Sequence, residues 1–315
     1  MATPIRFFTI VLNGMPFLRY HLPMLQQLKI PWEWHIAEGL AQLRHDTAWS
    51  LRKRLSWRIP FRLQTSGWIP DDLHQGGRSI DGTSQYLDEI AGLDSRVKLW
   101  RTPPGTCWDG KREMVRAACA GLNTETLLWQ IDSDELWTVD QIHTAHEMFA
   151  AAPAKMAARY WCHYYVGPEL EILERNCYGN GRDGWIRTWR ARPGDVWQAH
   201  EPPLLVRGEV PLCSNSFLQA ETEAQGLVFE HYAYVTEQQV GFKEAYYGYT
   251  NALRHWRQLQ QAVPPVQLER YLPWVHHPAR VGRRPAGGLA SYDAKTGKWS
   301  FPNLDASGRL AQLVA

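Results

Sequence analysis

The stretch LLWQIDSDELW (127–137) runs from an apolar segment into a group of acids, Asp132, Asp134 and Glu135. Carboxylates are seldom buried without a partner, so the apolar run must leave the core here or deliver its acids to a cation. Side chains two apart in an extended segment point to the same side. Asp132 and Asp134 can therefore share Mg²⁺ or Mn²⁺, or one can hold the metal while the other binds a ribose hydroxyl. The alternative is an acidic start of a helix, which is the interpretation that suits Glu135.

Outward from this stretch, strand patterns alternate with helix patterns, which predicts an α/β fold with a mixed, mostly parallel sheet flanked by helices. The expected strands are 6–13, 32–39, 97–100, 126–132, 155–166 and 226–235. The expected helices are 17–28, 81–93, 110–122, 141–152 and 236–260, the last two opened by capping boxes at Thr138/Gln141 and Thr236/Gln239. In such sheets the ligand crevice lies outside the carboxyl ends of the strands, where Asn13, Glu38 and Asp132 would converge.

Composition limits the class of protein. Of 315 residues, 44% are hydrophobic and 21% charged, which is typical of a globular protein, and the net charge of +2 gives no argument for nucleic acid. No run of eighteen apolar residues predicts a membrane span, and five cysteines without a CxxC pair indicate neither a zinc site nor a disulfide framework. A cytoplasmic protein is expected. The basic, aromatic cluster 44–62 favours a solvated insertion, with peripheral contact at the inner face of a membrane as the alternative.

Five segments, in this order, resemble the GT-A glycosyltransferases, especially the family 2-like group and the family that adds bisecting N-acetylglucosamine. They are IVLNGMPFL (10–18), SIDGTSQYL (79–87), WDGKREMVRAA (108–118), LLWQIDSDE (127–135) and FEHYAYV…FKEAYYG (229–248). The resemblance covers roughly residues 5–250. It implies a Rossmann-like GT-A catalytic domain over 1–260, with a nucleotide-binding half (1–135), an acceptor half (136–260) and an insertion at 41–78. Residues 261–315 would form a helical or irregular C-terminal extension that wraps the domain. The insertion departs from the family pattern because it separates Glu38 from the Asp-Gly-Thr turn.

The same resemblance implies a donor site for a nucleotide-diphosphate sugar and a cofactor, Mn²⁺ or Mg²⁺. Asn13 and Glu38 would line the base pocket, with Asp81 nearby, although Asp81 also suits the N-cap of the following helix. Lys111 or Arg112 would face the diphosphate. Asp132 would meet ribose or metal, and Asp134 and His231 would bind the metal; a hydrogen-bonded core histidine is the alternative for His231.

Transfer to an acceptor hydroxyl needs a base, which in an inverting enzyme is one Asp or Glu. The segment QAHEPPLL (198–205) offers Glu201, and GNGRDGW (179–185) offers Asp183 as the second candidate. Trp185, Trp189 and Trp197 flank these acids and suit stacking on an acceptor sugar, with plain packing as the alternative for at least one of them.

The sequence thus predicts a metal-dependent, inverting glycosyltransferase that uses a nucleotide sugar and a glycan or other hydroxyl acceptor. A sugar-phosphate nucleotidyltransferase is a rival, but it would open with a Gly-rich basic loop where this chain has NGMPFLRYH (13–21). A non-catalytic carbohydrate-binding protein of the same fold is the second rival, and intact Asp132 and Asp134 argue against it.

Overall fold

The computed structural model describes residues 2–42, 69–275, 277–284, 291–293 and 298–300. Four parallel strands form the centre of its main sheet, in the spatial order β3-β2-β1-β4. They are β1 (Ile5–Val11), β2 (Trp32–Glu38), β3 (Val97–Arg101) and β4 (Thr126–Gln130). The chain passes from β1 to β2 and β3 on one side and then returns to β4 on the other. This reversal places a Rossmann-like switch point between β1 and β4, where such sheets bind ligands.

Beyond β4 the sheet becomes antiparallel, in the order β8, β6, β7, β15 and β14. These strands are β8 (Trp185–Ala191), β6 (Ala157–Gly167), β7 (Leu170–Ile172), β15 (Arg280–Arg283) and β14 (Val266–Gln267). Three short strands lie off this path: β5 (Glu135–Leu136), β12 (Ser216–Phe217) and β13 (Val228–His231). The predicted α/β class with a mixed sheet and parallel central strands is confirmed.

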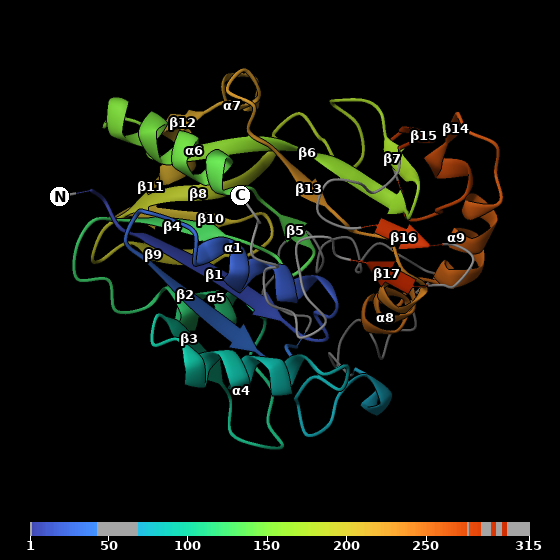
Figure 1. The fold of residues 1–315 in the computed structure, drawn as a ribbon, viewed down its shortest axis with the longest axis horizontal. Helices are drawn as coiled ribbons and strands as arrows, with labels where there is room; N and C mark the ends of the chain where they lie inside the picture. Colours follow the sequence, from blue (N-terminus) through green and yellow to red (C-terminus); the bar gives the residue numbers. More distant parts are fainter. Residues whose placement is uncertain (1, 43–68, 276, 285–290, 294–297, 301–315) are drawn as a thin grey trace, which may run out of the picture.

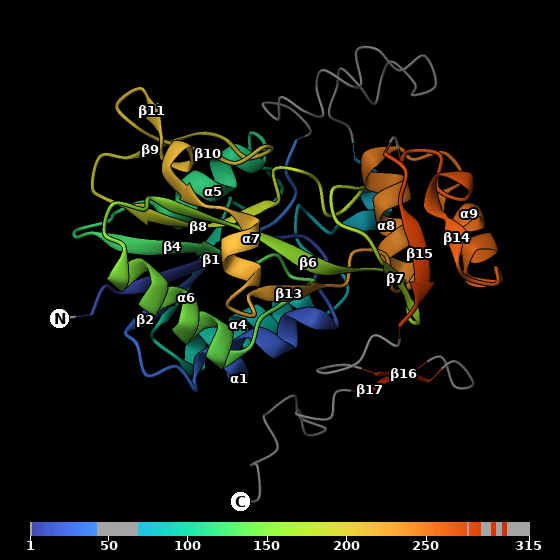
Figure 2. The same ribbon diagram turned by 90° about the horizontal axis from the view of Figure 1, so that it is seen from above.

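The two faces of the sheet are covered by different elements (Figures 1 and 2). One face packs on α1 (His21–Leu25), α4 (Thr83–Leu93) and α6 (Val139–Ala151). The other packs on α5 (Lys111–Cys119) and on a small sheet of β9 (Val196–Ala199), β10 (Leu204–Arg207) and β11 (Val210–Pro211). Phe7 and Phe8 show the alternation, since successive residues of β1 enter the two separate cores.

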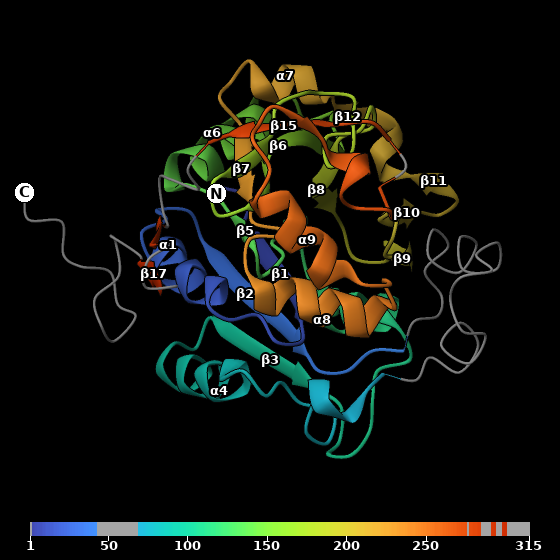
Figure 3. The ribbon, with the colours of Figure 1, turned by 90° about the vertical axis from the view of Figure 1, so that its right-hand side faces the viewer.

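Two helices lie across the carboxyl ends of the parallel strands, α8 (Glu237–Tyr247) and α9 (Ala252–Gln260), as Figures 1 and 3 show. The sequence predicted one helix over 236–260, which is wrong. Gly248 and Asn251 adopt left-handed backbone angles, φ 71° and φ 55°, and separate the two helices. The capping boxes at Thr138/Gln141 and Thr236/Gln239 are both confirmed.

Other differences are local. The helix expected over 17–28 is a 3-10 turn, η1 (Phe17–Tyr20), followed by the short α1. The turn-rich segment 178–205 contains β8 and β9. Short elements complete the described chain: η2 (Asp71–Leu73), η3 (Leu212–Asn215), α7 (Gln219–Glu223) and η4 (Leu268–Arg270).

The described parts of the segment 261–315 include strands as well as irregular chain. β14 and β15 extend the main sheet through β7, and β16 (Ser291–Asp293) pairs with β17 (Lys298–Ser300). The basic cluster 44–62, and with it most of the predicted insertion, lies outside the described residues. Within the described ranges, no helix has the length and apolar character needed to cross a bilayer.

Candidate active site

A cavity of about 1940 Å³ opens at the carboxyl ends of β1 and β4, beside α8. Its wall is built from segments that are far apart in the sequence. Of the candidate site residues from the sequence, it includes Asn13, Asp81, Lys111, Asp132, Asp134, Asp183, Trp185, Glu201 and His231, but not Glu38, Arg112, Trp189 or Trp197. The convergence expected from strand order for Asn13, Glu38 and Asp132 is therefore present for Asn13 and Asp132, whereas Glu38 does not border the cavity.

The turn after β4 that carries Asp132, Asp134 and Glu135, here called the acid turn, is fixed by backbone contacts on both sides. Glu135 N donates to Asp132 O at 3.0 Å, and Tyr232 N donates to Asp134 O at 2.8 Å, which joins the turn to the end of β13. Gly14 passes so close that an added Cβ would lie 3.0 Å from Ser133 Cβ and 2.7 Å from Val11 Cγ2. The Asn-Gly after β1 thus lets the two strand ends approach each other at the switch point.

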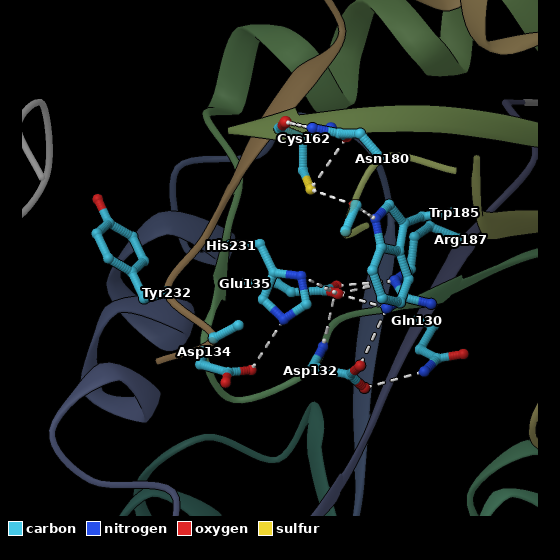
Figure 4. A network of polar contacts seen from close by, with 12 residues as sticks. Gln130, Asp132, Asp134, Glu135, Cys162, Asn180, Trp185, Arg187, His231 and Tyr232 are labelled. Atoms are coloured by element: carbon cyan, nitrogen blue, oxygen red, sulfur yellow. Dashed lines mark hydrogen bonds and ion pairs between the residues drawn. The ribbon is translucent and has the colours of Figure 1, made fainter. Parts of the chain in front are cut away.

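Arg187 of β8 is the central cation of the acid turn (Figure 4). Its Nη2 lies 3.1 Å from Asp132 Oδ2, and its guanidinium also contacts both carboxylate oxygens of Glu135, which is fully buried. Burial raises the pKa of Asp132, but Arg187 and the Gln130 amide together outweigh burial and hold that pKa below its usual value. Burial raises the pKa of Glu135 above its usual value, and the contact with Arg187 opposes the rise.

The helix-start interpretation of Glu135 is wrong. Glu135 begins β5, opposite His231 of β13, and α6 begins four residues later at Val139. A buried carboxylate in this position needs the guanidinium beside it, because an unpaired charge would carry a large desolvation penalty.

Asp134 has different neighbours from Asp132. Its Oδ1 lies 3.8 Å from His231 Nε2, and its Oδ2 lies 3.7 Å from Lys243 Nζ of α8. Both distances are too long for a hydrogen bond. Lys243 is held in place by Ala233 O at 2.6 Å and by the Tyr234 ring at 4.5 Å. Burial lowers the pKa of His231 to about 4, so its imidazole is neutral at pH 7.

These neighbours decide how well a divalent cation fits. Among the described residues, no three His, Cys, Asp or Glu groups are arranged as a ready ligand set. His231 Nε2 nevertheless faces Asp134, while Nδ1 on the other side of the ring lies 3.8 Å from Glu135 Oε1. Among the described residues, the carboxylate of Asp134 makes the two long contacts above. A carboxylate and a neutral imidazole are a normal donor pair for Mn²⁺, so Asp134 and His231 fit the ion. Asp132 fits less well because Arg187 and Gln130 already contact its carboxylate.

Asn13 borders the cavity, and its backbone is in the left-handed conformation (φ 58°). Ile80 N donates to its Oδ1 at 2.8 Å, and its own N donates to Ser79 Oγ at 3.0 Å. Asp81 accepts from Met15 N at 2.9 Å and from Thr83 N at 3.0 Å. Asp81 therefore fastens the β1 turn to the first residues of α4 while it faces the cavity.

Glu38 is placed differently from the expectation that it lines the base pocket. Its carboxylate is fully buried, lies 2.6 Å from Arg101 Nε, and accepts hydrogen bonds from Ser79 N at 3.2 Å and from Ser84 Oγ. Since Ser79 Oγ in turn holds Asn13, Glu38 supports the pocket wall from behind. Sequence order alone could not show this, because Glu38 and Ser79 are 41 residues apart.

Lys111, the first residue of α5, faces the cavity and donates from Nζ to Tyr247 Oη of α8 at 2.8 Å. Arg112 instead pairs with Glu113 at 2.9 Å. Of the two basic residues considered from the sequence, Lys111 is the one that borders the cavity.

The cavity wall also carries the two candidate bases. Glu201 precedes Pro202 and borders the cavity beside His200, whose pKa is lowered to about 3 by burial and then by the nearby Lys111 charge. Asp183 also borders it, but 94% of its side chain is exposed. Of the three tryptophans considered for stacking, Trp185 lines the cavity, whereas Trp189 and Trp197 are buried and pack against Phe8.

Sequence reasoning missed several cavity residues, among them Arg187 and Lys243. Arg187 sits in the strand pattern WIRTWR (185–190), where a buried arginine is unusual enough to indicate a charged partner. Lys243 lies on the helix face that carries Gln239, Tyr246 and Tyr247, all of which line the cavity. No local pattern identifies that face as the one turned toward the acids.

Fold and site together define an α/β protein with a ligand cavity at the switch point of a Rossmann-like half-sheet. No protein-family model matches the sequence, and no curated protein matches it. Among solved structures, the chain is similar to the crystal structure of S. aureus TarS 1–349, at 12% sequence identity and a TM-score of 0.33. That alignment covers 51% of this chain and 36% of the TarS chain, and at this level it carries no conclusion about activity.

Proposed function

We propose that the protein is a glycosyltransferase that moves a sugar from a nucleotide-diphosphate sugar to a hydroxyl acceptor. One observation carries the proposal: Asn13, Lys111, Asp132 and Glu201 border a single cavity at the switch point between β1 and β4. These four residues would supply the groups that the reaction needs: contacts to the nucleotide base, the diphosphate and the ribose, and an acceptor for the proton of the attacking hydroxyl.

On the donor side, Asn13 would contact the nucleotide base and Asp132 the ribose. Lys111 would face the diphosphate, whose negative charge grows as the sugar leaves. The hydrogen bond from Lys111 to Tyr247 and the contacts of Asn13 with Ser79 and Ile80 support this division, because they hold both side chains at the cavity wall.

We further propose that Mn²⁺ or Mg²⁺ binds at Asp134, with His231 and Asp132 as neighbours. When bound, the ion supplies Lewis-acid stabilisation of the leaving diphosphate. The position of His231 Nε2, 3.8 Å from Asp134 Oδ1, and the long contacts of the Asp134 carboxylate support a cation here. Lys243, at 3.7 Å from Asp134, would have to share that carboxylate with the ion or turn toward the phosphates.

On the acceptor side, Glu201 would remove the proton from the attacking hydroxyl, which gives an inverting reaction. Glu201 borders the cavity in the turn that leads into β10. Asp183 is the second candidate for this role, and its high exposure makes it the weaker one.

Calorimetry with UDP and GDP, with and without Mn²⁺, tests the donor site, and a screen of nucleotide sugars for hydrolysis then identifies the donor. We expect micromolar to millimolar nucleotide binding that strengthens with Mn²⁺. Asp134→Ala should remove the Mn²⁺-dependent part of the affinity, whereas Asp140→Ala, an exposed acid in the first turn of α6, should bind like the wild type.

The outcomes separate the rival functions. Absence of nucleotide binding by the wild-type protein would overturn the transferase proposal and leave a carbohydrate-binding protein. Nucleotide binding in which Asp134→Ala behaves like the wild type would keep the transferase and reject the metal assignment.

A further inference from the structure

A second cavity, of about 240 Å³, adjoins the main one and shares part of its wall. Tyr178, Trp185 and Trp274 border both cavities. They come from three places: the loop before β8, the first residue of β8, and the segment between η4 and β15. The smaller volume equals about eight water molecules, which suits one six-membered ring with its hydroxyl groups.

The two indoles are held in fixed orientations. Trp185 Nε1 donates to Gly179 O at 2.7 Å, and its ring lies 4.8 Å from Arg187 Cζ and 5.1 Å from the His231 ring. Trp274 stacks on Tyr249 with a centroid distance of 4.8 Å and an interplanar angle of 4°. Both indoles are only partly buried, so each keeps surface that borders the cavities.

The loop that carries Tyr178 depends on a glycine. Gly179 has φ 77°, and an added Cβ would lie 2.6 Å from the Tyr164 ring. The loop can therefore pass close to Tyr164 and present its carbonyl to Trp185 only with glycine at this position.

Polar groups surround these aromatic faces. The hydroxyl groups of Tyr178 and Tyr234 are 3.0 Å apart, His277 borders the smaller cavity, and Glu201 borders the larger one. A pyranose ring matches such a wall because it has apolar C–H faces and a rim of hydroxyls, the same division that aromatic and polar side chains make here. An acyl chain matches it poorly, because it offers no hydrogen-bonding group to the polar side chains of this wall.

We propose that Trp185, Trp274 and Tyr178 form the subsite for a pyranose ring of a glycan acceptor. The proposal rests on the proposed function, in that Glu201 would face the acceptor hydroxyl, and it narrows the acceptor class to carbohydrate. Trp185 touches His231 and Arg187, so a ring on this wall would lie next to the acid turn where the donor sugar would be held.

The test measures binding of a fluorescent-labelled protein to immobilised pyranose oligosaccharides based on glucose, galactose, mannose and N-acetylglucosamine, with immobilised acyl chains alongside. We expect binding to at least one sugar series and none to acyl chains. Trp274→Ala should weaken sugar binding tenfold or more, and Trp274→Phe should recover most of it. Trp100→Ala is the matched control, because Trp100 is 39% exposed on β3 and lies outside both cavities.

Nucleotide affinity, measured by calorimetry for the wild type and for Trp274→Ala, distinguishes the possible failures. A variant that loses sugar binding but still binds nucleotide is folded, and a wild-type protein that binds no nucleotide contradicts the transferase proposal. Sugar binding that Trp274→Ala leaves unchanged, binding to acyl chains, or no sugar binding by the wild type would each overturn the subsite, even if the nucleotide binds. If Trp274→Ala loses sugar binding and the wild-type protein binds no nucleotide, the results support the subsite and reject the transferase.

Discussion

The donor wall and the acceptor wall of the cavity are built in different ways. The donor wall consists of residues that directly follow strands, Asn13 after β1 and Asp132 after β4, and backbone hydrogen bonds hold them. The acceptor wall combines Tyr178, Glu201 and Trp274, which lie on separate loops and meet only through tertiary packing. The difference teaches that strand order would position the proposed donor, whereas side-chain packing among irregular segments would select the proposed acceptor.

The largest effect is expected on the acceptor wall. Glu201→Gln should lower turnover by about 10² to 10⁴-fold, because the amide cannot accept the proton of the acceptor hydroxyl. Nucleotide affinity should remain, since the proposed donor contacts are made by Asn13, Lys111 and Asp132 and not by Glu201. Steady-state transfer assays with the donor found by screening measure the loss.

Glu209→Gln, on the exposed turn between β10 and β11, is the matched control and should transfer sugar normally. If Glu201→Gln keeps wild-type turnover while Asp183→Asn loses it, Asp183 is the general base, and the acceptor hydroxyl must bind next to Asp183 instead of Glu201.

Arg187 joins the two walls, because it contacts the acid turn and the Trp185 ring. Arg187→Ala would leave Asp132 and Glu135 without their cation, one of them fully buried, and should lower the free energy of unfolding by about 3–5 kcal/mol. Urea unfolding followed by tryptophan fluorescence measures the change.

Arg257→Ala provides the contrast, since Arg257 pairs with Glu237 on the surface and should shift the unfolding midpoint little. Equal effects of the two substitutions would mean that the guanidinium of Arg187 is not the buried counterion of the acids.

Sequence reasoning reached the donor wall because its signals are local. The apolar run before Asp132 and the strand before Asn13 could be recognised within ten residues, and the order of strands places both ends together. It failed for Glu38, whose partners Ser79 and Arg101 lie beyond the insertion. It also failed for Lys243 and Trp274, because the position of α8 and of the chain after η4 depends on packing across the whole domain.

Two buried histidines, His21 behind the acid turn and His200 at the cavity, predict a common pH response. Burial lowers the pKa of His21, beside the β1 turn, to about 4 and that of His200, on the acceptor wall, to about 3. Both are neutral in the folded protein but take up a proton near pH 6.5 when unfolded. Their contribution to stability is therefore complete above pH 6.5 and declines as the pH falls toward 4, by at most about 1.4 kcal/mol per pH unit for each group.

Urea unfolding at pH 7.0, 6.0 and 5.0 measures this slope. His200→Asn should reduce the dependence of the free energy of unfolding on pH by the contribution of one histidine. The free energy of unfolding of the same variant at pH 7.0 gives the loss that is due to packing alone. A slope that does not change in His200→Asn would mean that this imidazole is accessible to protons in the folded state.

The smallest effect is expected behind the donor wall, at Ser79. Ser79 Oγ accepts the hydrogen bond of Asn13 N at 3.0 Å, and Ser79 N donates to the buried Glu38 carboxylate. Ser79→Ala removes only the first of these bonds, so the free energy of unfolding should fall by about 1 kcal/mol. Nucleotide affinity should fall with it, by about fivefold, because Asn13 keeps its left-handed turn only while the neighbouring chain holds it.

Ser214→Ala removes a comparable hydroxyl, whose bond to Pro211 O at 2.7 Å lies in an exposed turn on the acceptor side, and should leave nucleotide affinity unchanged. Calorimetry on both variants therefore asks whether the donor wall is held by its hydrogen bonds. A Ser79→Ala protein that loses stability but binds nucleotide as the wild type does would show that Asn13 is placed by packing instead. The contrast between a wall fixed by backbone bonds and a wall fixed by packing would then not hold at this position.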